Sequence, residues 1–234
     1  MSMADTVDAP VVPIRDAATI VLVRDTQTDT PRVLMGQRGA GAVFMPSKYV
    51  FPGGAVDPSD RHVTLGRPLP EQEVRRLAQL PVTETAPSPQ TMAAAALREL
   101  WEESGLMLGC PGDWPGNIAP DWADFAKAGL LPAADGLRFL FRAVTPKGRP
   151  RRFDARFFLA DASGVAGDLD DFSRATDELS HLHWIELAEA RKLDLPFITE
   201  VVLAEAEAIL REGGQESVPF FDNSGAESIF RRIA

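Results

Sequence analysis

The sequence predicts a layered α/β fold. Segments rich in β-branched and aromatic residues alternate with segments whose apolar residues recur at helical spacing, which is typical of helices packed on both sides of a sheet. The chain of 234 residues is 45% hydrophobic and can bury one substantial core. We therefore expect a single domain over residues 17–212, after a loosely ordered arm (1–16) and before an irregular tail (213–234).

The first two predicted strands form an antiparallel pair. Ala17–Arg24 reads AATIVLVR, which is apolar and β-branched enough to be buried on both faces of a sheet. Arg32–Arg38 reads RVLMGQR and follows after a polar turn. Further strands are expected at 49–51, 106–108, 137–144 and 151–160, and the last two should form a hairpin around the turn PKGRP.

The most clearly bounded helix is predicted over 89–104. Ser88 can cap its start, Pro89 suits its first position, and Gly105 suits the left-handed conformation that ends a helix. Other helices are expected at 69–80, 121–129, 187–192 and 197–212. The helix at 69–80 lies in an apparent insertion, 58–87, which either shapes substrate choice or only decorates the surface. Residues 161–177 are acidic and polar, as in a mobile loop.

Three carboxylates share one face of the predicted helix. Glu99, Glu102 and Glu103 are spaced i, i+3 and i+4, and like charges at that spacing repel one another. A hard divalent cation such as Mg²⁺ would offset this repulsion. Arg98, one turn before Glu102, could orient the carboxylates from outside a metal shell. The alternative is a solvated acidic helix face.

Two stretches carry a family resemblance. RELWEESGL, Arg98–Leu106, resembles the second half of the Nudix box, Arg-Glu-apolar-x-Glu-Glu-x-Gly-apolar, and FPGGAVDPSD, Phe51–Asp60, resembles its opening, with Gly54 as the glycine. The chain departs from the pattern twice, because Asp60 stands in place of the usual glutamate and roughly thirty extra residues follow it. This insertion, with the runs FMPxxxVFPGG and TPxxRPRRFDxRFF, resembles the Nudix subgroup that includes the peroxisomal coenzyme A diphosphatase of animals.

The resemblance implies a Nudix α/β/α sandwich with a mixed central sheet. It also implies metal-dependent hydrolysis of a diphosphate linkage in a nucleoside diphosphate derivative, with coenzyme A or acyl-coenzyme A first among substrates. The products would then be 3′,5′-ADP and (acyl-)4′-phosphopantetheine. An ADP-ribose or nucleotide-sugar diphosphatase is one alternative, and a Nudix regulator that binds nucleotide without cleaving it is another. No Walker loop or nucleophilic-serine motif is found.

The expected metal site combines the box glutamates with a backbone carbonyl. Glu99, Glu102, Glu103 and the carbonyl of Gly54 would hold Mg²⁺, for which Mn²⁺ could substitute. Glu99 and Glu178 are both candidates for the general base, because Nudix members differ over whether that base lies in the box or in a later loop.

An anionic substrate must meet local positive charge, since the formal net charge of the chain is −10. The predicted hairpin supplies a basic cluster, and arginine suits phosphate because its planar guanidinium can bond two oxygens. The residues of the cluster are Lys147, Arg149, Arg151, Arg152 and Arg156. We expect Arg152 and Arg156 to bind substrate, because strand positions hold geometry better than turn positions, and we add Arg38. Solvated turn charges are the alternative.

Composition limits the partners and the compartment. The acidic balance argues against nucleic acid and anionic membrane as partners, since both are negatively charged. Cys110 is the single cysteine, so no intramolecular disulfide can form, and a reducing, cytoplasmic location is expected. The first sixteen residues lack the pattern of a secretion signal. A homodimer is compatible with the sequence.

Overall fold

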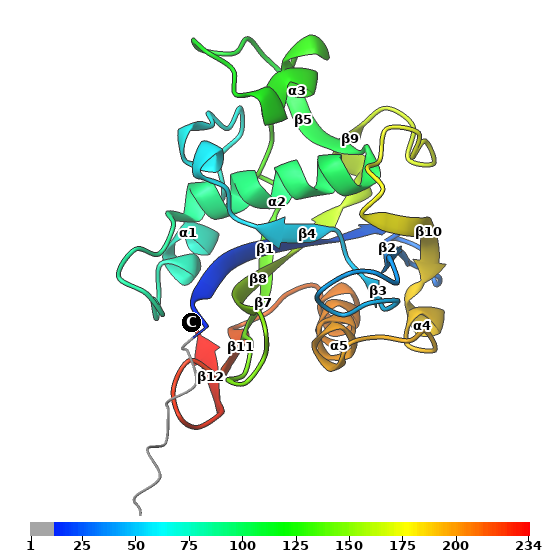
Figure 1. Cartoon of the computed structure of the whole chain (residues 1–234). Helices are drawn as coiled ribbons and strands as arrows, with labels where there is room; N and C mark the ends of the chain where they lie inside the picture. The colour runs from blue at the N-terminus through cyan, green and yellow to red at the C-terminus, as the bar shows by residue number, and fades with distance from the viewer. Residues whose placement is uncertain (1–11) are drawn as a thin grey trace, which may run out of the picture.

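A computed structural model describes residues 12–234, and Figure 1 shows how its helices enclose a central sheet. The strands are β1 (Ile14–Arg24), β2 (Arg32–Arg38), β3 (Tyr49–Val50), β4 (Gly53–Ala55), β5 (Met107–Pro111), β6 (Leu130–Pro132), β7 (Arg138–Val144), β8 (Arg152–Asp161), β9 (Val165–Ala166), β10 (Leu179–Glu186), β11 (Val218–Asp222) and β12 (Ile229–Ile233). The helices are η1 (Pro58–His62), α1 (Glu71–Leu77), α2 (Pro89–Ser104), η2 (Pro120–Trp122), α3 (Ala123–Lys127), η3 (Ala162–Gly164), α4 (Leu187–Ala190) and α5 (Phe197–Glu212).

The central sheet is mixed. Its strand order is β10-β2-β1-β8-β7-β11-β12, and the short strands β3 and β4 pair with β2 and β1. β1 runs parallel to β8, and β7 runs parallel to β11, whereas the other pairs are antiparallel. As expected from the sequence, β2 pairs antiparallel with β1. Strands β6, β5 and β9 form a separate small sheet.

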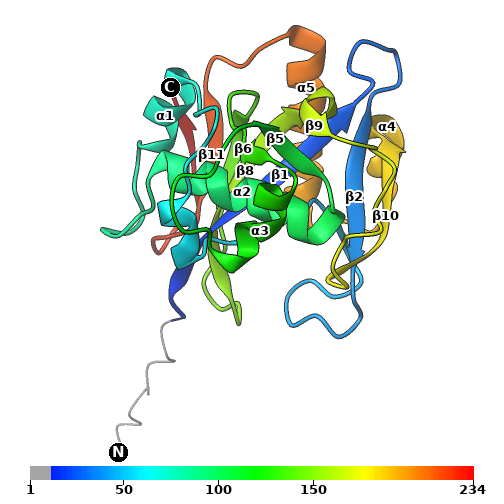
Figure 2. The same ribbon diagram turned by 90° about the horizontal axis from the view of Figure 1, so that it is seen from above.

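Each face of the central sheet carries its own apolar core. Successive side chains of a strand point to opposite faces, so Ile20 and Leu22 of β1 join the core beneath α2, while Val21 and Val23 join the core beneath α5. Figure 1 shows α2 above the sheet and α5 below it, and Figure 2 shows the same layers from above. This arrangement confirms the predicted α/β/α sandwich with a mixed sheet.

Several element boundaries agree with the sequence predictions. β2, α2 and α5 span the predicted residues, and the predicted hairpin is formed by β7 and β8. β1 begins at Ile14, so residues 14–16 belong to the sheet rather than to the arm expected over 1–16. Residues 12 and 13 precede the strand, and residues 1–11 of that expected arm lie outside the described part of the chain.

The prediction of an irregular tail over 213–234 is wrong. Residues 218–222 form β11, which pairs in parallel with β7 through Phe220 opposite Arg142, and β12 then turns back along β11. Val218, Phe220 and Ile233 are fully buried. The apolar residues of this segment extend the core beneath α2, and their burial stabilises the two strands.

The segment 58–87 holds η1 and α1, and buried polar contacts attach α1 to the sheet. Glu73 accepts a hydrogen bond from the backbone N–H of Phe139 at 3.2 Å. Arg76 donates to the carbonyls of Gln215 and Glu216, each at 3.0 Å. The side chains of Glu73 and Arg76 are both buried. α1 and the C-terminal strands therefore lie on the same side of the molecule, as Figures 1 and 2 show.

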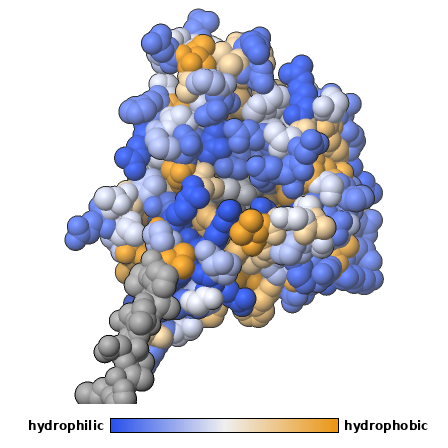
Figure 3. All heavy atoms as spheres, viewed as in Figure 1, coloured by the Kyte–Doolittle hydropathy of each residue, from blue (hydrophilic) through white to orange (hydrophobic). Residues whose placement is uncertain are grey.

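The outer surface is predominantly polar on the face drawn in Figure 3, with small scattered apolar patches. In the part of the chain that the structure describes, none of the helices combines the length and the apolarity needed to cross a bilayer.

Candidate active site

The helix α2 is built as its sequence predicts. The side chain of Ser88 accepts a hydrogen bond from the N–H of Thr91 at 3.1 Å, and Gly105 ends the helix in the left-handed conformation with φ 76°. Residues 93–96 are four consecutive alanines, all buried, and small side chains allow the helix to pack closely on the sheet. These contacts fix the direction in which the carboxylates of the next turn point.

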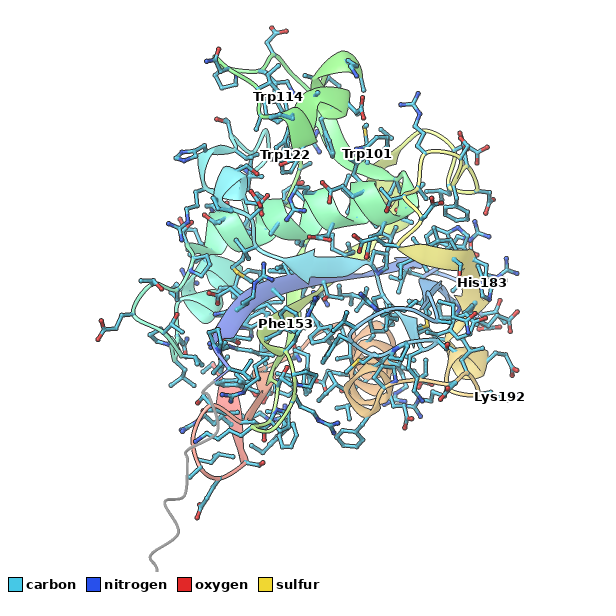
Figure 4. All side chains as sticks on the ribbon, in the orientation of Figure 1. Trp101, Trp114, Trp122, Phe153, His183 and Lys192 are labelled. Carbon is cyan, nitrogen blue, oxygen red and sulfur yellow. The ribbon has the colours of Figure 1, made fainter. Side chains whose placement is uncertain are left out.

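Two of the three glutamates are held against β4. An oxygen of Glu103, which is 2% exposed, accepts a hydrogen bond from the N–H of Gly53 at 2.7 Å. A Cβ atom at Gly54 would lie 2.5 Å from the carboxylate of Glu99, so only glycine fits at that position. Figure 4 shows oxygen-tipped side chains between α2 and β4. Strand β4 and helix α2 thus enclose these carboxylates from two sides.

Arg98 lies at the centre of an ion-pair network. Its guanidinium donates to both oxygens of Asp60, at 2.9 and 3.1 Å, and to Glu99 and Glu102 at 2.9 and 3.0 Å. It also donates to the carbonyl of Ala55 at 3.0 Å. Burial alone would favour the neutral form of Arg98, but the bond to Asp60 and the neighbouring glutamates raise its pKa, so Arg98 stays charged.

Burial makes the glutamates weak acids. It raises the pKa of Glu99 to about 7, although Arg98 acts in the opposite direction. Burial likewise raises the pKa of Glu103 to about 8, against the hydrogen bond from Gly53. The pKa of Glu102 is also raised by burial. Near neutral pH the site therefore lacks enough positive charge to keep all its carboxylates ionised.

The donor set fits a hard divalent cation. Carboxylate and carbonyl oxygens are the ligands that Mg²⁺ and Ca²⁺ take, and within residues 12–234 no ion pair compensates the buried Glu103. In that same part of the chain, no group of three acidic, histidine or cysteine side chains surrounds one point. Glu99 and Glu102 are bonded to Arg98 instead. A cation would supply the charge that Glu103 lacks.

The comparisons with known proteins agree with this geometry. No protein-family model matches the chain. It is 33% identical to nudix hydrolase 7 of Caenorhabditis elegans over 187 aligned residues, which include 75% of this chain and 52% of that protein. The structure resembles that of a Nudix hydrolase from Alicyclobacillus acidocaldarius, with a TM-score of 0.61, 28% identity, and coverage of 86% of this chain and 96% of that chain. The chain is similar in sequence and in fold to Nudix hydrolases.

A second relative shares part of this chain. The acyl-coenzyme A diphosphatase NUDT19 of Gallus gallus is 29% identical over 121 residues, which include 44% of this chain and 32% of that protein. The chain thus spans about half the length of the worm relative and about a third of the length of the chicken relative.

The Nudix box is assembled across its insertion. Asp60, in the place of the usual glutamate, is 1% exposed and reaches Arg98, because η1 folds back beside the box helix. Its other bond, from the N–H of Asp57 at 2.8 Å, closes a capping box at the start of η1. Glu73, another acid of the segment 58–87, bonds to the backbone of Phe139 instead.

Glu178 and Arg38 both lie near the box. Glu178 directly precedes β10, is exposed, and is close enough to Glu99 and Glu103 to raise the pKa of each. Arg38 ends β2 opposite Leu179 of β10, and its charge acts to lower the pKa of Glu103. The Nε atom of Arg38 is buried, and no hydrogen-bond partner for it is found in the described part of the chain.

The structure gives Arg152 and Arg156, which we predicted to bind substrate, internal partners that count against this role. Arg152 is 5% exposed and donates to the carbonyls of Thr145 and Asn223, at 3.0 and 2.9 Å. Arg156 is 3% exposed and forms ion pairs with Asp16 and Asp154. Strand alternation places these arginines on a covered face of the sheet, where internal partners occupy their donors.

The sequence analysis missed this internal network. Its centre is Asp154, which also accepts two hydrogen bonds from the buried Arg142, at 2.8 and 2.7 Å. The signal was present in RFDAR, residues 152–156. Asp154 is two residues from each arginine, and residues at that spacing lie on the same face of a strand. The other members of the predicted basic cluster, Lys147, Arg149 and Arg151, are exposed in or beside the hairpin turn.

Proposed function

We propose that this chain is a Nudix-type diphosphatase that hydrolyses a nucleoside diphosphate derivative in a reaction dependent on a divalent metal. The observation that carries the proposal is the pair of buried glutamates, Glu99 and Glu103, which lie between α2 and β4. The pKa values of both are raised. A cluster of acids that stays short of positive charge suits a site completed by a cation and a phosphate group.

The metal would be held by Glu99, Glu102, Glu103 and the carbonyl of Gly54, with Mg²⁺ first and Mn²⁺ as a substitute. Such a cation, when bound, neutralises diphosphate oxygens and makes a bound water more acidic. Arg98 does not hold the metal in this proposal. Its bonds to Asp60, Glu99 and Glu102 orient the ligands instead.

Glu178 is the proposed general base. The three box glutamates serve as ligands, and their oxygens are then unavailable to accept a proton from water. Glu178 is the remaining carboxylate close to Glu99 and Glu103, and its exposed side chain takes no part in the Arg98 network. It can accept the proton while the water attacks phosphorus, and general-base catalysis typically contributes about 10²- to 10⁴-fold in rate.

Arg38 is the proposed phosphate ligand. Its buried Nε has no partner in the described part of the chain, and its charge acts to lower the pKa of Glu103. Guanidinium groups bind phosphate oxygens strongly because two parallel hydrogen bonds form. With Arg152 and Arg156 engaged internally, Arg38 takes the place that the sequence analysis gave to the hairpin.

Coenzyme A or its acyl esters are the proposed substrates. The printed name of the Gallus gallus relative supports this choice. The test is product analysis by mass spectrometry after incubation with Mg²⁺. We expect 3′,5′-ADP and 4′-phosphopantetheine. Intact coenzyme A beside cleaved ADP-ribose would overturn the choice of substrate, and ligand binding without turnover on a broad diphosphate panel would favour a regulatory Nudix domain.

A further inference from the structure

The loop between β9 and β10 docks on the end of the box helix. The N–H of Thr176 donates a hydrogen bond of 2.8 Å to the carbonyl of Glu102. The last carbonyls of a helix have no partner within it, and here Gly105 bonds only the carbonyl of Trp101, while Leu106 bonds the side chain of Ser104. The loop therefore supplies the bond that satisfies Glu102, a residue of the box itself.

Gly105 leaves room for this contact. A Cβ atom there would lie 3.1 Å from the Cβ of Arg174 and 3.3 Å from the backbone nitrogen of Ala175. The guanidinium of Arg174 lies 5.9 Å from the ring centre of Trp101, on the last turn of α2. Figure 1 shows the loop beside this end of α2, and Figure 4 labels Trp101 there.

The other half of the loop is fixed as well. The indole N–H of Trp184 donates to the carbonyl of Leu169 at 2.9 Å, and Arg24 donates to Asp170 at 2.8 Å. Phe172 packs against the apolar core beneath α2. The segment expected from sequence to be a mobile loop is thus attached both to the sheet and to the box helix.

We propose that Thr176 is a positioning residue, whose backbone bond to Glu102 sets the place of Glu178 relative to the carboxylates of α2. Glu178 is two residues beyond Thr176, and Leu179 then enters β10 opposite Arg38, so the chain is fixed on both sides of Glu178. This inference rests on the proposed hydrolase function and adds the means by which a base outside the box is aligned with it.

The variant Thr176→Pro tests the bond, because proline has no backbone N–H. Thr176→Ala is the matched control, since it changes the side chain and keeps the donor. Each is combined with Glu178→Gln, and kcat, KM and Mg²⁺ affinity are measured for all of them. We expect Thr176→Pro to lower kcat by about 10²-fold, as Glu178→Gln does, with KM and Mg²⁺ affinity little changed. Thr176→Ala should keep the wild-type kcat.

The double variant decides the mechanism. If Thr176 acts through Glu178, Thr176→Pro should cost nothing further in the Glu178→Gln background, since coupled residues are not additive. Losses that multiply, or full activity of Thr176→Pro, would overturn the proposal.

Amide hydrogen exchange of the wild-type protein separates this inference from the proposed function. The Thr176 amide should be protected despite its exposed side chain, because it is bonded to Glu102. A Thr176 amide that exchanges at the rate of an unstructured chain would overturn the docking, whatever the activity. A protected amide in a protein without turnover on any diphosphate would support the docking and count against the hydrolase function.

Discussion

Two of the clusters of buried charge in the described part of the chain differ in their balance of positive and negative groups. The box cluster consists of Asp60, Arg98, Glu99, Glu102 and Glu103, in which three of the four carboxylates bond to the one arginine and Glu103 does not. The sheet cluster consists of Asp16, Arg142, Asp154 and Arg156, in which two carboxylates meet two arginines.

The two clusters differ in whether the protein itself supplies a partner for each buried charge. In the sheet cluster the donors of Arg142 that do not meet Asp154 bond to the carbonyls of Gln79 and Leu80, and its guanidinium lies over the ring of Phe220 at 4.3 Å. That cluster is satisfied by the protein alone. The box cluster leaves Glu103 without a counter-charge among the described residues, which suits a group that must bind a cation.

The largest expected effect comes from removing the excess acid of the box cluster. Glu103→Gln should abolish turnover, with a loss of at least about 10²-fold, because it removes a proposed metal ligand while glutamine can still accept the bond from Gly53. Steady-state kinetics with Mg²⁺, beside a circular dichroism spectrum, checks this. Glu200→Gln, at an exposed position of α5, is the control and should keep wild-type activity. Retained activity in Glu103→Gln would remove Glu103 from the metal site.

The sheet cluster should respond in stability rather than in chemistry. Asp154→Asn leaves Arg142 and Arg156 buried without their shared counter-charge, and breaking such a pair typically costs about 3–5 kcal/mol. Urea unfolding should show a lower midpoint with an unchanged slope. The kcat of the remaining folded protein should stay near that of the wild type. A large loss of kcat at full stability would mean that this cluster takes part in the reaction.

Metal binding should depend on pH through the box cluster. Protons compete with the cation for Glu99 and Glu103, whose pKa values are raised to about 7 and about 8. We therefore expect Mg²⁺ affinity to rise between about pH 6 and pH 8.5. At a fixed Mg²⁺ concentration, the stabilisation of the fold by Mg²⁺ should rise with it, and it reaches about 2.7 kcal/mol where that concentration is a hundredfold above Kd. Calorimetric titration at several pH values measures the affinity. Affinity independent of pH would contradict the proposed ligands.

The smallest effect concerns the metal-free protein. Burial raises the pKa of Glu103 in the folded state to about 8, above the ordinary glutamate value of 4.5. Its contribution to stability is therefore fully present below about pH 4.5 and is lost as pH rises through about 8. In a chelator, melting temperatures at pH 6 and pH 8.5 should differ less for Glu103→Gln than for the wild type. Equal differences would show that Glu103 ionises normally in the fold.

Local signals predicted the elements that caps and periodicity define. α2 begins after Ser88 and ends at Gly105 because its cap residues act within one turn of chain. The box glutamates share a face for an equally local reason, since helix geometry alone sets their spacing. β11 escaped prediction because its burial depends on β7, about eighty residues earlier in the chain.

The arginines show where local reasoning fails. Arg98 is next to Glu99 in sequence and Arg156 is two residues from Asp154, and both arginines are almost fully buried. The partners of Arg98 include its neighbours on α2, so its role could be read from the motif. The partner Asp16 of Arg156 lies on β1, which only the parallel pairing of β1 with β8 brings near.

The sequence by itself determined which carboxylates stand together, because their spacing on one helix is a property of the local backbone. Tertiary structure alone decided which charges are left uncompensated, because desolvation and counter-charge arise from strands and loops distant in the chain. Burial against β4 makes Glu103 a weak acid, and burial against Asp16 and Asp154 removes Arg156 from solvent. Residue type fixes the charge a side chain can carry, and packing fixes whether another group of the protein already meets that charge.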